Sequence, residues 1–294
     1  MDNPASVKDW LGRTQRDEDE VALGAVQRLA ATLDQDPTAF KRSSALPESW
    51  YAILFGTLAR QSDLGPDGHP TTGDFMPPMH GTRRMFAGRR VTFHRALKVG
   101  DAVTRLSTVT RAEPKTGRTG AFTLVTVTHE MSGPAGLAIT EEQDLVYRAP
   151  AAKDATAKAE AGADRVGQPP AVEREPPQWS RTTAPDPVLL FRYSALTFNA
   201  HRIHYDLPYT RDVEGYPALV MNGGLTALLL VETARAHLPG RVAGYDARAL
   251  HPLFVGESIA FNGRLAGESA AELWACGPDG TRAYQVNVLL GRRP

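Results

Sequence analysis

The chain contains 294 residues, of which 42% are hydrophobic and 22% are charged, and these fractions are typical of a globular protein. A chain of this length suits two domains of about 130–150 residues each. The 33 basic residues balance the 33 acidic residues, and this neutrality argues against binding to nucleic acid or to an acidic membrane surface.

The single cysteine, Cys276, excludes an internal disulfide bond and a metal cluster held by several thiolates. The N-terminal residues lack the basic and apolar pattern of a signal peptide, and no apolar run is long enough to span a bilayer. We therefore expect a soluble protein of the cytoplasm.

Residues 6–60 are predicted to be largely helical. The acidic run Asp17–Glu20 would suit the positive N-terminal end of a helix over residues 21–33. Every fourth residue of that range is apolar, which lines one helical face. A second apolar segment, Trp50–Leu58, follows Pro47, a residue type that often begins a helix.

Strands are predicted to follow these helices. Residues 61–78 are rich in glycine and proline and indicate a loop. The next segments are rich in β-branched and aromatic residues and are separated by turns at 115–118 and 132–136. They are Val91–Phe93, Val103–Thr110, Ala121–His129 and Leu137–Tyr147. Helices followed by an antiparallel meander predict an α+β unit.

Residues 149–177 contain mainly Ala, Lys, Glu, Gly and Pro, and this composition predicts a flexible linker. The linker divides the chain into a first unit, residues 1–148, and a second unit, residues 178–294. In the second unit a loop with two histidines precedes an apolar helix over Leu225–Leu238, and four strands follow. These strands are Val242–Leu250, Ser258–Leu265, Ala271–Cys276 and Ala283–Leu290.

A short repeat connects the two units. Ala96–Asp101 matches Pro252–Glu257, so that Gly100 corresponds to Gly256, 156 residues later. Each copy follows a short strand and opens a longer one, which indicates a duplication. Two copies of a helix wrapped by an antiparallel sheet would form a double hot-dog. Because only the second copy carries the histidine loop, we expect one active half and one degenerate half that shapes the ligand site.

His204 is the leading candidate for a general base, since an imidazole changes its charge near neutral pH. The alternative is a structural histidine that bonds a loop carbonyl. Asn199 could orient a water or hold the His204 ring, although an asparagine in a loop is often only a turn residue. His201, His204 and Asp206 could also bind a metal. However, the segment is not clearly helical and no third histidine lies at a suitable spacing, so we predict neither a metal nor another cofactor.

Asn222-Gly223-Gly224 begins the apolar helix. The Gly223 amide, at the positive end of the helix dipole, could stabilise a negatively charged oxygen. The alternative is that these three residues form only a turn and a helix cap. Upstream, two pairs of arginines flank Met85–Gly88: Arg83 and Arg84, and Arg89 and Arg90. They form either a solvated surface or a site for a substrate carboxylate or phosphate.

Several of these segments resemble the MaoC-like hydratases, also called hydratase 2. Within that family the chain is most similar to the type 2 3-hydroxyacyl-thioester dehydratases and to the itaconyl-CoA and mesaconyl-CoA hydratases. The resemblance covers most of the chain except the linker. The segments that carry it are Phe75–Pro78, Arg83–Val91, Phe93–Asp101, Phe198–Asp206 and Glu214–Pro217.

The resemblance implies a double hot-dog fold and the reversible addition of water to a 2-enoyl thioester. The acid–base pair of the family, an Asp and a His, corresponds to Asn199 and His204, and the polar position between them to His201. The oxyanion glycine corresponds to Gly223. Asn199 departs from the pattern because an amide cannot accept a proton as a carboxylate does, which leaves the base role to His204. Asn222-Gly223-Gly224 also departs, since His-Gly-Pro is common there.

We therefore predict an acyl-CoA hydratase in which His204, Asn199 and Gly223 are catalytic. His201, Asn222 and Gly224 would contact the substrate, and Arg83 or Arg84 would hold the distal carboxylate of a dicarboxylic acyl group. Two alternatives stay open, a dehydratase of thioesters on a carrier protein and a thioester-binding partner without activity. The chain could also pair as a homodimer.

Overall fold

The computed structural model describes residues 7–71, 75–76, 83–117, 120–148 and 176–291. Nearly all of the predicted linker, 149–177, lies outside the described residues. The division of the chain that rests on this linker therefore stays a prediction.

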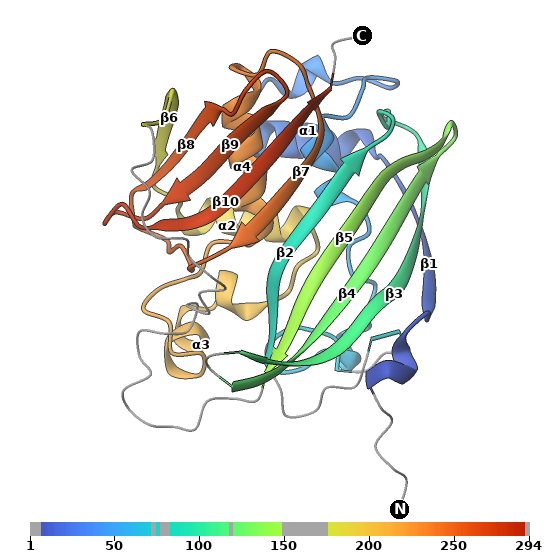
Figure 1. Cartoon of the computed structure of the whole chain (residues 1–294), viewed down its shortest axis with the longest axis vertical. Helices are drawn as coiled ribbons and strands as arrows, with labels where there is room; N and C mark the ends of the chain where they lie inside the picture. The colour runs from blue at the N-terminus through green and yellow to red at the C-terminus, as the bar shows by residue number, and fades with distance from the viewer. Residues whose placement is uncertain (1–6, 72–74, 77–82, 118–119, 149–175, 292–294) are drawn as a thin grey trace, which may run out of the picture.

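One ten-stranded antiparallel sheet runs through both halves of the chain (Figure 1), in the order β1-β3-β4-β5-β2-β7-β10-β9-β8-β6. The first half contributes β1 (Thr14–Glu20), β2 (Arg83–Phe93), β3 (Ala102–Gly117), β4 (Gly120–Gly133) and β5 (Gly136–Arg148). The second half contributes β6 (Trp179–Thr183), β7 (Arg241–Ala249), β8 (Ile259–Leu265), β9 (Ala270–Cys276) and β10 (Arg282–Gly291). Eight of these strands confirm predicted segments, while β1 and β6 were not predicted.

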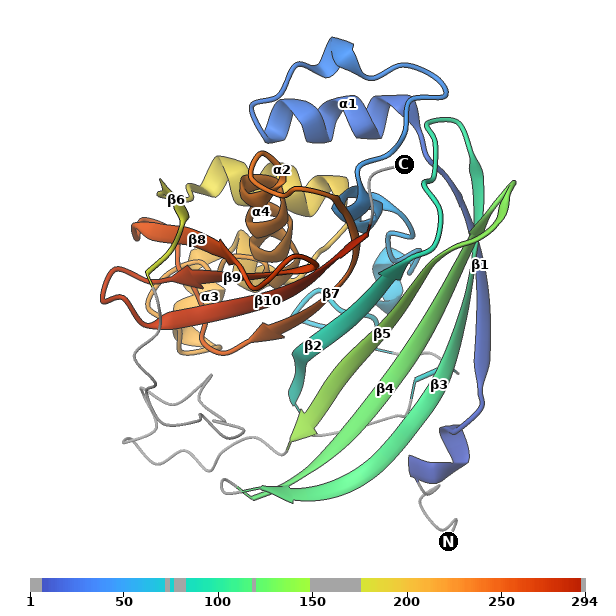
Figure 2. The same ribbon diagram turned by 45° about the horizontal axis from the view of Figure 1, so that its top comes forward.

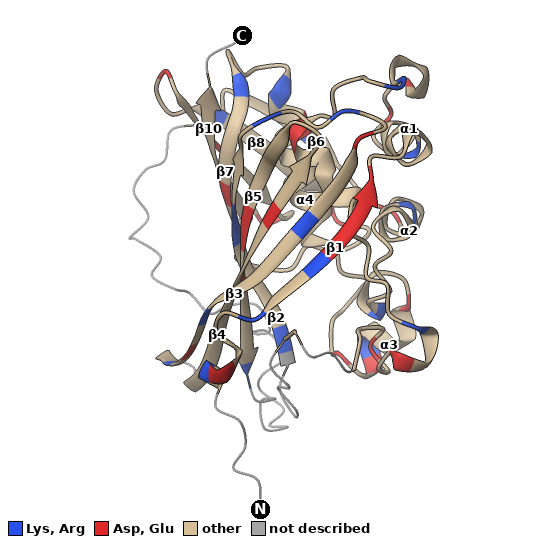
Figure 3. Ribbon diagram, turned by 90° about the vertical axis from the view of Figure 1, so that its right-hand side faces the viewer, with Lys and Arg blue, Asp and Glu red and all other residues tan. Residues whose placement is uncertain are grey.

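The helices lie on one side of this sheet, as the side view in Figure 3 shows for α1, α2 and α3. The α-helices are α1 (Leu23–Thr32), α2 (Pro187–Leu196), α3 (Leu207–Asp212) and α4 (Gly223–Arg235). The 3-10 helices are η1 (Val7–Trp10), η2 (Pro37–Ala39), η3 (Glu48–Ile53), η4 (Gln61–Asp63) and η6 (Arg202–His204). No helix in the described part of the chain is both long and apolar enough to cross a membrane.

The two halves meet where β2 pairs with β7 at the centre of the sheet. Two glycines 156 residues apart, Gly88 and Gly244, lie at this junction. A Cβ atom on Gly88 would lie 2.7 Å from the Ala247 carbonyl oxygen, and one on Gly244 would lie 2.5 Å from that of Val91. Both strands therefore need glycine at the matching position to approach each other.

The hydrogen bonds confirm the internal repeat. Leu46 N donates to the Leu97 carbonyl at 2.8 Å, and Met221 N donates to the Leu253 carbonyl at the same distance. Gly100 and Gly256 both adopt a positive φ, of 95° and 85°. The acceptors Leu97 and Leu253 again differ by 156 residues. Each half thus contains the same turn, and the residues after Leu46 correspond to the residues after Met221.

The element after this matching point differs between the halves. In the second half it is α4, whose buried residues pack against the inner face of β8, β9 and β10 (Figure 2). Full burial of each large aliphatic side chain stabilises the fold by roughly 1.5–3 kcal/mol. In the first half it is the short helix η3, so the prediction of a helix over Trp50–Leu58 was wrong. Pro47 begins this element as expected, but it has only 3-10 geometry and ends at Ile53.

The acidic run also differs from its prediction. Asp17–Glu20 belongs to β1, an edge strand that pairs with β3, and not to a helix N-terminus. The Asp17 carboxylate accepts a hydrogen bond from Arg105 at 2.8 Å, which supplies the positive charge that the helix was expected to supply. The helix itself is confirmed, beginning at Leu23, with Val26 and Leu29 fully buried.

Candidate active site

The histidine loop lies between α2 and α3 and packs beside the start of α4. Phe198 has a positive φ of 49°, which turns the chain sharply at the end of α2. Val220 N then donates to the Ile203 carbonyl at 2.9 Å. These contacts place the loop against the segment that leads into Gly223. The structure therefore brings the two predicted parts of the site, the histidines and the helix start, together.

His204 is buried, and its Nδ1 lies 2.7 Å from the Val220 carbonyl oxygen. A carbonyl only accepts hydrogen bonds, so we assign the proton to Nδ1 and the lone pair to Nε2. Burial lowers the pKa of His204 to about 4, because it outweighs the hydrogen bond to Val220 that favours the proton. The ring is thus neutral at pH 7, with Nε2 ready to accept a proton.

Asn199 is half-buried and stabilises the loop. Its Oδ1 accepts a hydrogen bond from the His201 backbone N–H at 3.0 Å. This is the turn role that the sequence left open. Its Nδ2 makes no hydrogen bond with a described residue, so this group can donate to a water molecule or to a ligand.

Gly223 is the first residue of α4, and the amides of the first helical turn have no partner within the helix. The preceding residue, Asn222, is buried and does not cap the helix with its side chain. Its Nδ2 donates to Ser194 Oγ at 3.4 Å, while its Oδ1 is buried without a partner among the described residues. The helix start can thus donate to a substrate oxygen.

The glycines at 223 and 224 have different surroundings. A Cβ on Gly223 would lie 3.6 Å from Cε2 of Tyr284, an ordinary contact, so the protein itself does not require glycine there. A Cβ on Gly224 would lie 2.6 Å from the Tyr193 hydroxyl, so packing explains this glycine. The proposed contact between Gly224 and the substrate stays a prediction.

The four arginines of β2 separate into different environments. In the backbone register, Arg83 and Arg84 stand opposite Arg148 and Tyr147 at the start of the strand, and the side chain of Arg83 lies outside the described part of the chain. Arg84 is exposed, hydrogen-bonds Tyr147 and is close enough to His201 to lower the pKa of that imidazole. In contrast, Arg89 and Arg90 form ion pairs. Arg89 points to the buried face and pairs with Glu141 at 3.3 Å, and Arg90 pairs with Glu142 and Asp144, both at 2.7 Å.

Sequence reasoning missed a contribution from the first half, the loop after η4. Arg202 N donates to the Asp67 carbonyl at 2.9 Å, and Arg202 Nη1 donates to the Pro66 carbonyl at 2.8 Å. His69, on the same loop, has its ring centroid 4.3 Å from that of His201, which in turn lies 5.5 Å from that of His204. Three imidazoles therefore lie close together. The only signal in the sequence was His69 itself, inside a stretch that indicates no more than a loop.

The structure brings together a different set of possible metal ligands from His201, His204 and Asp206, the set that the sequence suggested. Asp206 accepts two hydrogen bonds from Arg202 and caps α3 through Tyr209 N, so its carboxylate is already occupied. Ligand atoms of Asp67, His69 and His201, however, all lie within 4.8 Å of one another. Burial, helped by His69 and His204, lowers the pKa of His201 to about 3, and this imidazole is neutral at pH 7.

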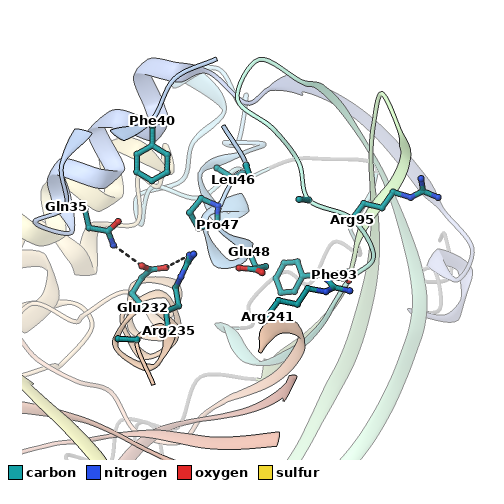
Figure 4. A pocket seen from close by; sticks show the side chains of 13 residues that line it. Gln35, Phe40, Leu46, Pro47, Glu48, Phe93, Arg95, Glu232, Arg235 and Arg241 are labelled. Atoms are coloured by element: carbon teal, nitrogen blue, oxygen red, sulfur yellow. Dashed lines mark hydrogen bonds and ion pairs between the residues drawn. The ribbon is translucent and has the colours of Figure 1, made fainter. Parts of the chain in front are cut away.

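The corresponding position in the first half has no such chemistry. A cavity of about 520 Å³ lies there, at the other end of α4 (Figure 4), with Leu46, Pro47 and Glu48 in its wall. By the repeat these residues match Met221, Asn222 and Gly223. Pro47 has no N–H, and Glu48 places a carboxylate where Gly223 leaves space. This half therefore has a carboxylate at the position that matches Gly223.

The comparisons with known proteins support the fold described above and identify the family. Residues 50–255 match the family model for hydroxyacyl-thioester dehydratase type 2. The chain is 42% identical, over 96% of its length and 97% of the relative, to mesaconyl-C(4)-CoA hydratase of Chloroflexus aurantiacus. A MaoC-like dehydratase from Phytophthora capsici superposes with a TM-score of 0.69 at 15% identity, covering 99% of this chain and 100% of that one. A double hot-dog protein of Mycobacterium tuberculosis superposes with a TM-score of 0.53 at 15% identity, covering 96% of each chain.

The fold is a double hot-dog, and its site holds a buried, neutral imidazole beside a helix N-terminus. The match to the family model and the identity over nearly the full length then assign the family. The chain belongs to the hydroxyacyl-thioester dehydratase type 2 family. The predicted resemblance and the predicted fold class are both confirmed.

Proposed function

We propose that this enzyme hydrates the double bond of a branched dicarboxylic enoyl-CoA, as its relative mesaconyl-C(4)-CoA hydratase is named for doing. The observation that carries this proposal is the 42% identity over 96% of the chain. The neutral, buried His204 supports the chemistry, since its free Nε2 is suited to take a proton from water. The proposal makes CoA the carrier of the acyl group and places the reaction in the cytoplasm.

In the proposed reaction, His204 Nε2 accepts a proton from a water molecule to which Asn199 Nδ2 is bound. The water oxygen forms a bond to C3 of the enoyl group, and the electron pair of the double bond moves towards the thioester. The negative charge that develops on the thioester oxygen faces the Gly223 amide. The proton held on His204 Nε2 then adds to C2, which returns the imidazole to its neutral form, and the product is a 3-hydroxyacyl thioester. One oxyanion donor of this kind contributes about 10²–10³ in rate in other enzymes.

Arg84 is our candidate for the distal carboxylate. It lies at the start of β2, is exposed, and is electrostatically coupled to His201. A guanidinium binds a carboxylate in a bidentate way, which fixes the orientation of the acyl group as well as its charge. Arg89 is a weaker candidate because Glu141 already neutralises it in the buried face of the sheet.

Replacing His204 tests the reaction. His204→Gln should lower kcat by about 10²–10⁴, the usual contribution of a general base, with little change in the unfolding midpoint. His94→Gln is the matched control, because His94 is exposed on the first half and its ring bonds only Thr140 among the described residues. Undiminished hydration of enoyl-CoA substrates by folded His204→Gln protein would refute the assignment.

Comparing substrates tests the acyl group. Mesaconyl-CoA should be hydrated with a higher kcat/KM than crotonyl-CoA, which lacks the second carboxylate. Arg84→Gln should reduce kcat/KM for mesaconyl-CoA by about 10- to 100-fold, as expected for a charged hydrogen bond, and should leave crotonyl-CoA unchanged. Arg181→Gln, on the edge strand β6, is the control. Equal losses for both substrates would show that Arg84 acts on something other than the carboxylate.

The same hydration assay tests whether CoA carries the acyl group and whether the chain is catalytically active. Mesaconyl groups on a carrier protein should be poorer substrates than mesaconyl-CoA, and a preference for the carrier protein would favour the alternative dehydratase. Tight binding of acyl-CoAs without any turnover would favour the alternative of an inactive thioester-binding partner.

A further inference from the structure

Asp67, His69 and His201 stand together beside His204, and we propose that they bind a borderline divalent cation such as Zn²⁺. One ligand atom of each side chain lies within 4.8 Å of the other two. Ligand atoms about 2.0–2.1 Å from a tetrahedral Zn²⁺ are themselves about 3.4 Å apart. Small side-chain rotations would therefore bring the three ligands into place, and a water molecule would fill the fourth position.

The backbone holds these side chains near one another without any ion. Two hydrogen bonds from Arg202 fix the Asp67 loop to the histidine loop, through the carbonyls of Pro66 and Asp67. Gly68 has a φ of 90°, and a Cβ on it would lie 1.9 Å from the Ala200 carbonyl oxygen. Only glycine permits this approach. The two loops, although far apart in the sequence, thus form one preorganised unit.

The imidazoles keep unpaired nitrogens. His69 Nδ1 lies 2.9 Å from Asp67 Oδ2, which leaves its Nε2 open. His201 is half-buried, and neither of its ring nitrogens bonds a described residue; only its backbone N–H is used, by Asn199. Buried and half-buried polar groups are usually paired, so this ring is suited to a ligand.

The donor set selects the class of metal. Two imidazole nitrogens and one carboxylate oxygen suit Zn²⁺, Co²⁺, Ni²⁺ or Cu²⁺, whereas Mg²⁺ and Ca²⁺ prefer oxygen ligands. The proposed site should therefore bind these transition-metal ions in preference to Mg²⁺ or Ca²⁺.

The position of the ion gives it an effect on catalysis, an inference that rests on the proposed function. The His201 ring lies edge-on to that of His204, with centroids 5.5 Å apart. An ion bound to His201 would therefore lie next to the proposed base and change its surroundings. Zn²⁺ should therefore inhibit hydration reversibly, and the reaction itself should need no metal.

The first test measures binding alone, with the full chain free of any purification tag. Titration of metal-free protein with Co²⁺ should produce the visible absorption of a tetrahedral site, and Zn²⁺ should displace it at one ion per chain. His69→Gln, His201→Gln and Asp67→Asn should each weaken Zn²⁺ binding by about 10- to 100-fold or more. His94→Gln should bind as the unaltered chain does. Wild-type affinity in both His69→Gln and His201→Gln, or equal affinity for Mg²⁺, would overturn the proposal.

The second test measures inhibition. Zn²⁺ should inhibit hydration by the unaltered chain, EDTA should restore it, and His69→Gln should resist the inhibition while hydrating its substrate in the absence of Zn²⁺. Loss of activity on adding EDTA to the untreated enzyme would overturn the inhibitory role. If the chain binds Zn²⁺ as expected but hydrates no enoyl thioester, the proposed function fails and the metal site stands.

Discussion

Gly223 and Gly224 are adjacent, yet alanine at these two positions should have opposite effects. At position 224 the added Cβ would lie 2.6 Å from the Tyr193 hydroxyl, and Tyr193 is only 4% exposed, so it has little room to move. Overpacking of a buried site costs about 1–3 kcal/mol, and Gly224→Ala should lower the free energy of unfolding by that amount. Adding Tyr193→Phe removes the oxygen, after which the nearest remaining ring atom lies at 3.6 Å, and most of the loss should be recovered.

At position 223 the nearest atom to the added Cβ would be Cε2 of Tyr284, at 3.6 Å. Gly223→Ala should therefore change stability by less than about 0.5 kcal/mol or raise it slightly, since alanine has the better helix propensity. The methyl group would instead occupy the space in front of the amide that faces the thioester oxygen. A displacement of the reacting group by about 1 Å can cost 10²-fold in rate, so kcat/KM should fall by about that factor.

Urea unfolding at constant m-value measures the stability of the single and double variants, and hydration of mesaconyl-CoA measures their activity. The reasoning is refuted if Gly223→Ala loses as much stability as Gly224→Ala. It is also refuted if Gly223→Ala keeps full activity, or if Tyr193→Phe fails to rescue Gly224→Ala.

Two further predictions concern carboxylates that pair within the fold. The Glu232 carboxylate accepts hydrogen bonds from Gln35, Ser49, Trp50 and Arg235 and so joins α4 to the first half. Glu232→Ala should destabilise the chain by about 1–3 kcal/mol in urea unfolding, while Glu268→Ala, at an exposed position, should have no effect. Although burial opposes it, hydrogen bonds and charge from Arg282 and Arg264 lower the pKa of Glu272 below its ordinary value of 4.5. A depressed pKa stabilises the fold above pH 4.5 and less so as the pH falls, so the stability difference between the unaltered chain and Glu272→Gln should shrink from pH 7 to pH 3. A difference that stays constant over this range would show that Glu272 is not titrating as described.

Most of the sheet could be predicted because β-branched residues mark its strands directly, as in Ala121–His129. In the structure this segment is part of the longer strand β4, and the predicted turn at 132–136 is confirmed. The strand β1 was missed because its residues are nearly all polar, and its partner on β3 is some 90 residues away. The helix expected after Pro47 was wrong because the local sequence does not show that η3 contacts the second half. There the hydroxyl of Tyr51 lies 3.2 Å from that of Tyr245.

The site was predicted only where its parts are close in the sequence. His204 follows Asn199 by five residues, and Gly223 begins the next long apolar segment, so one passage of the chain contains all three. Asp67 and His69 are more than 130 residues upstream, and only the folded chain brings them to His201. The different roles of Gly223 and Gly224 also require coordinates, because Tyr193 and Tyr284 reach them from α2 and β10.

The duplication explains why two similar halves produce one site. The matching hydrogen bonds of Leu46 and Met221 show that both halves contain the same turn. In the first half the Glu48 carboxylate stands at the position that matches Gly223, and it would repel a negatively charged thioester oxygen. The first half contributes the Asp67–His69 loop, which is hydrogen-bonded to the histidine loop, and Arg84 of β2, our candidate for the distal carboxylate. The residues that we propose for the distal carboxylate and for the metal thus come partly from the first half, while the proposed base and the proposed oxyanion donor come from the second.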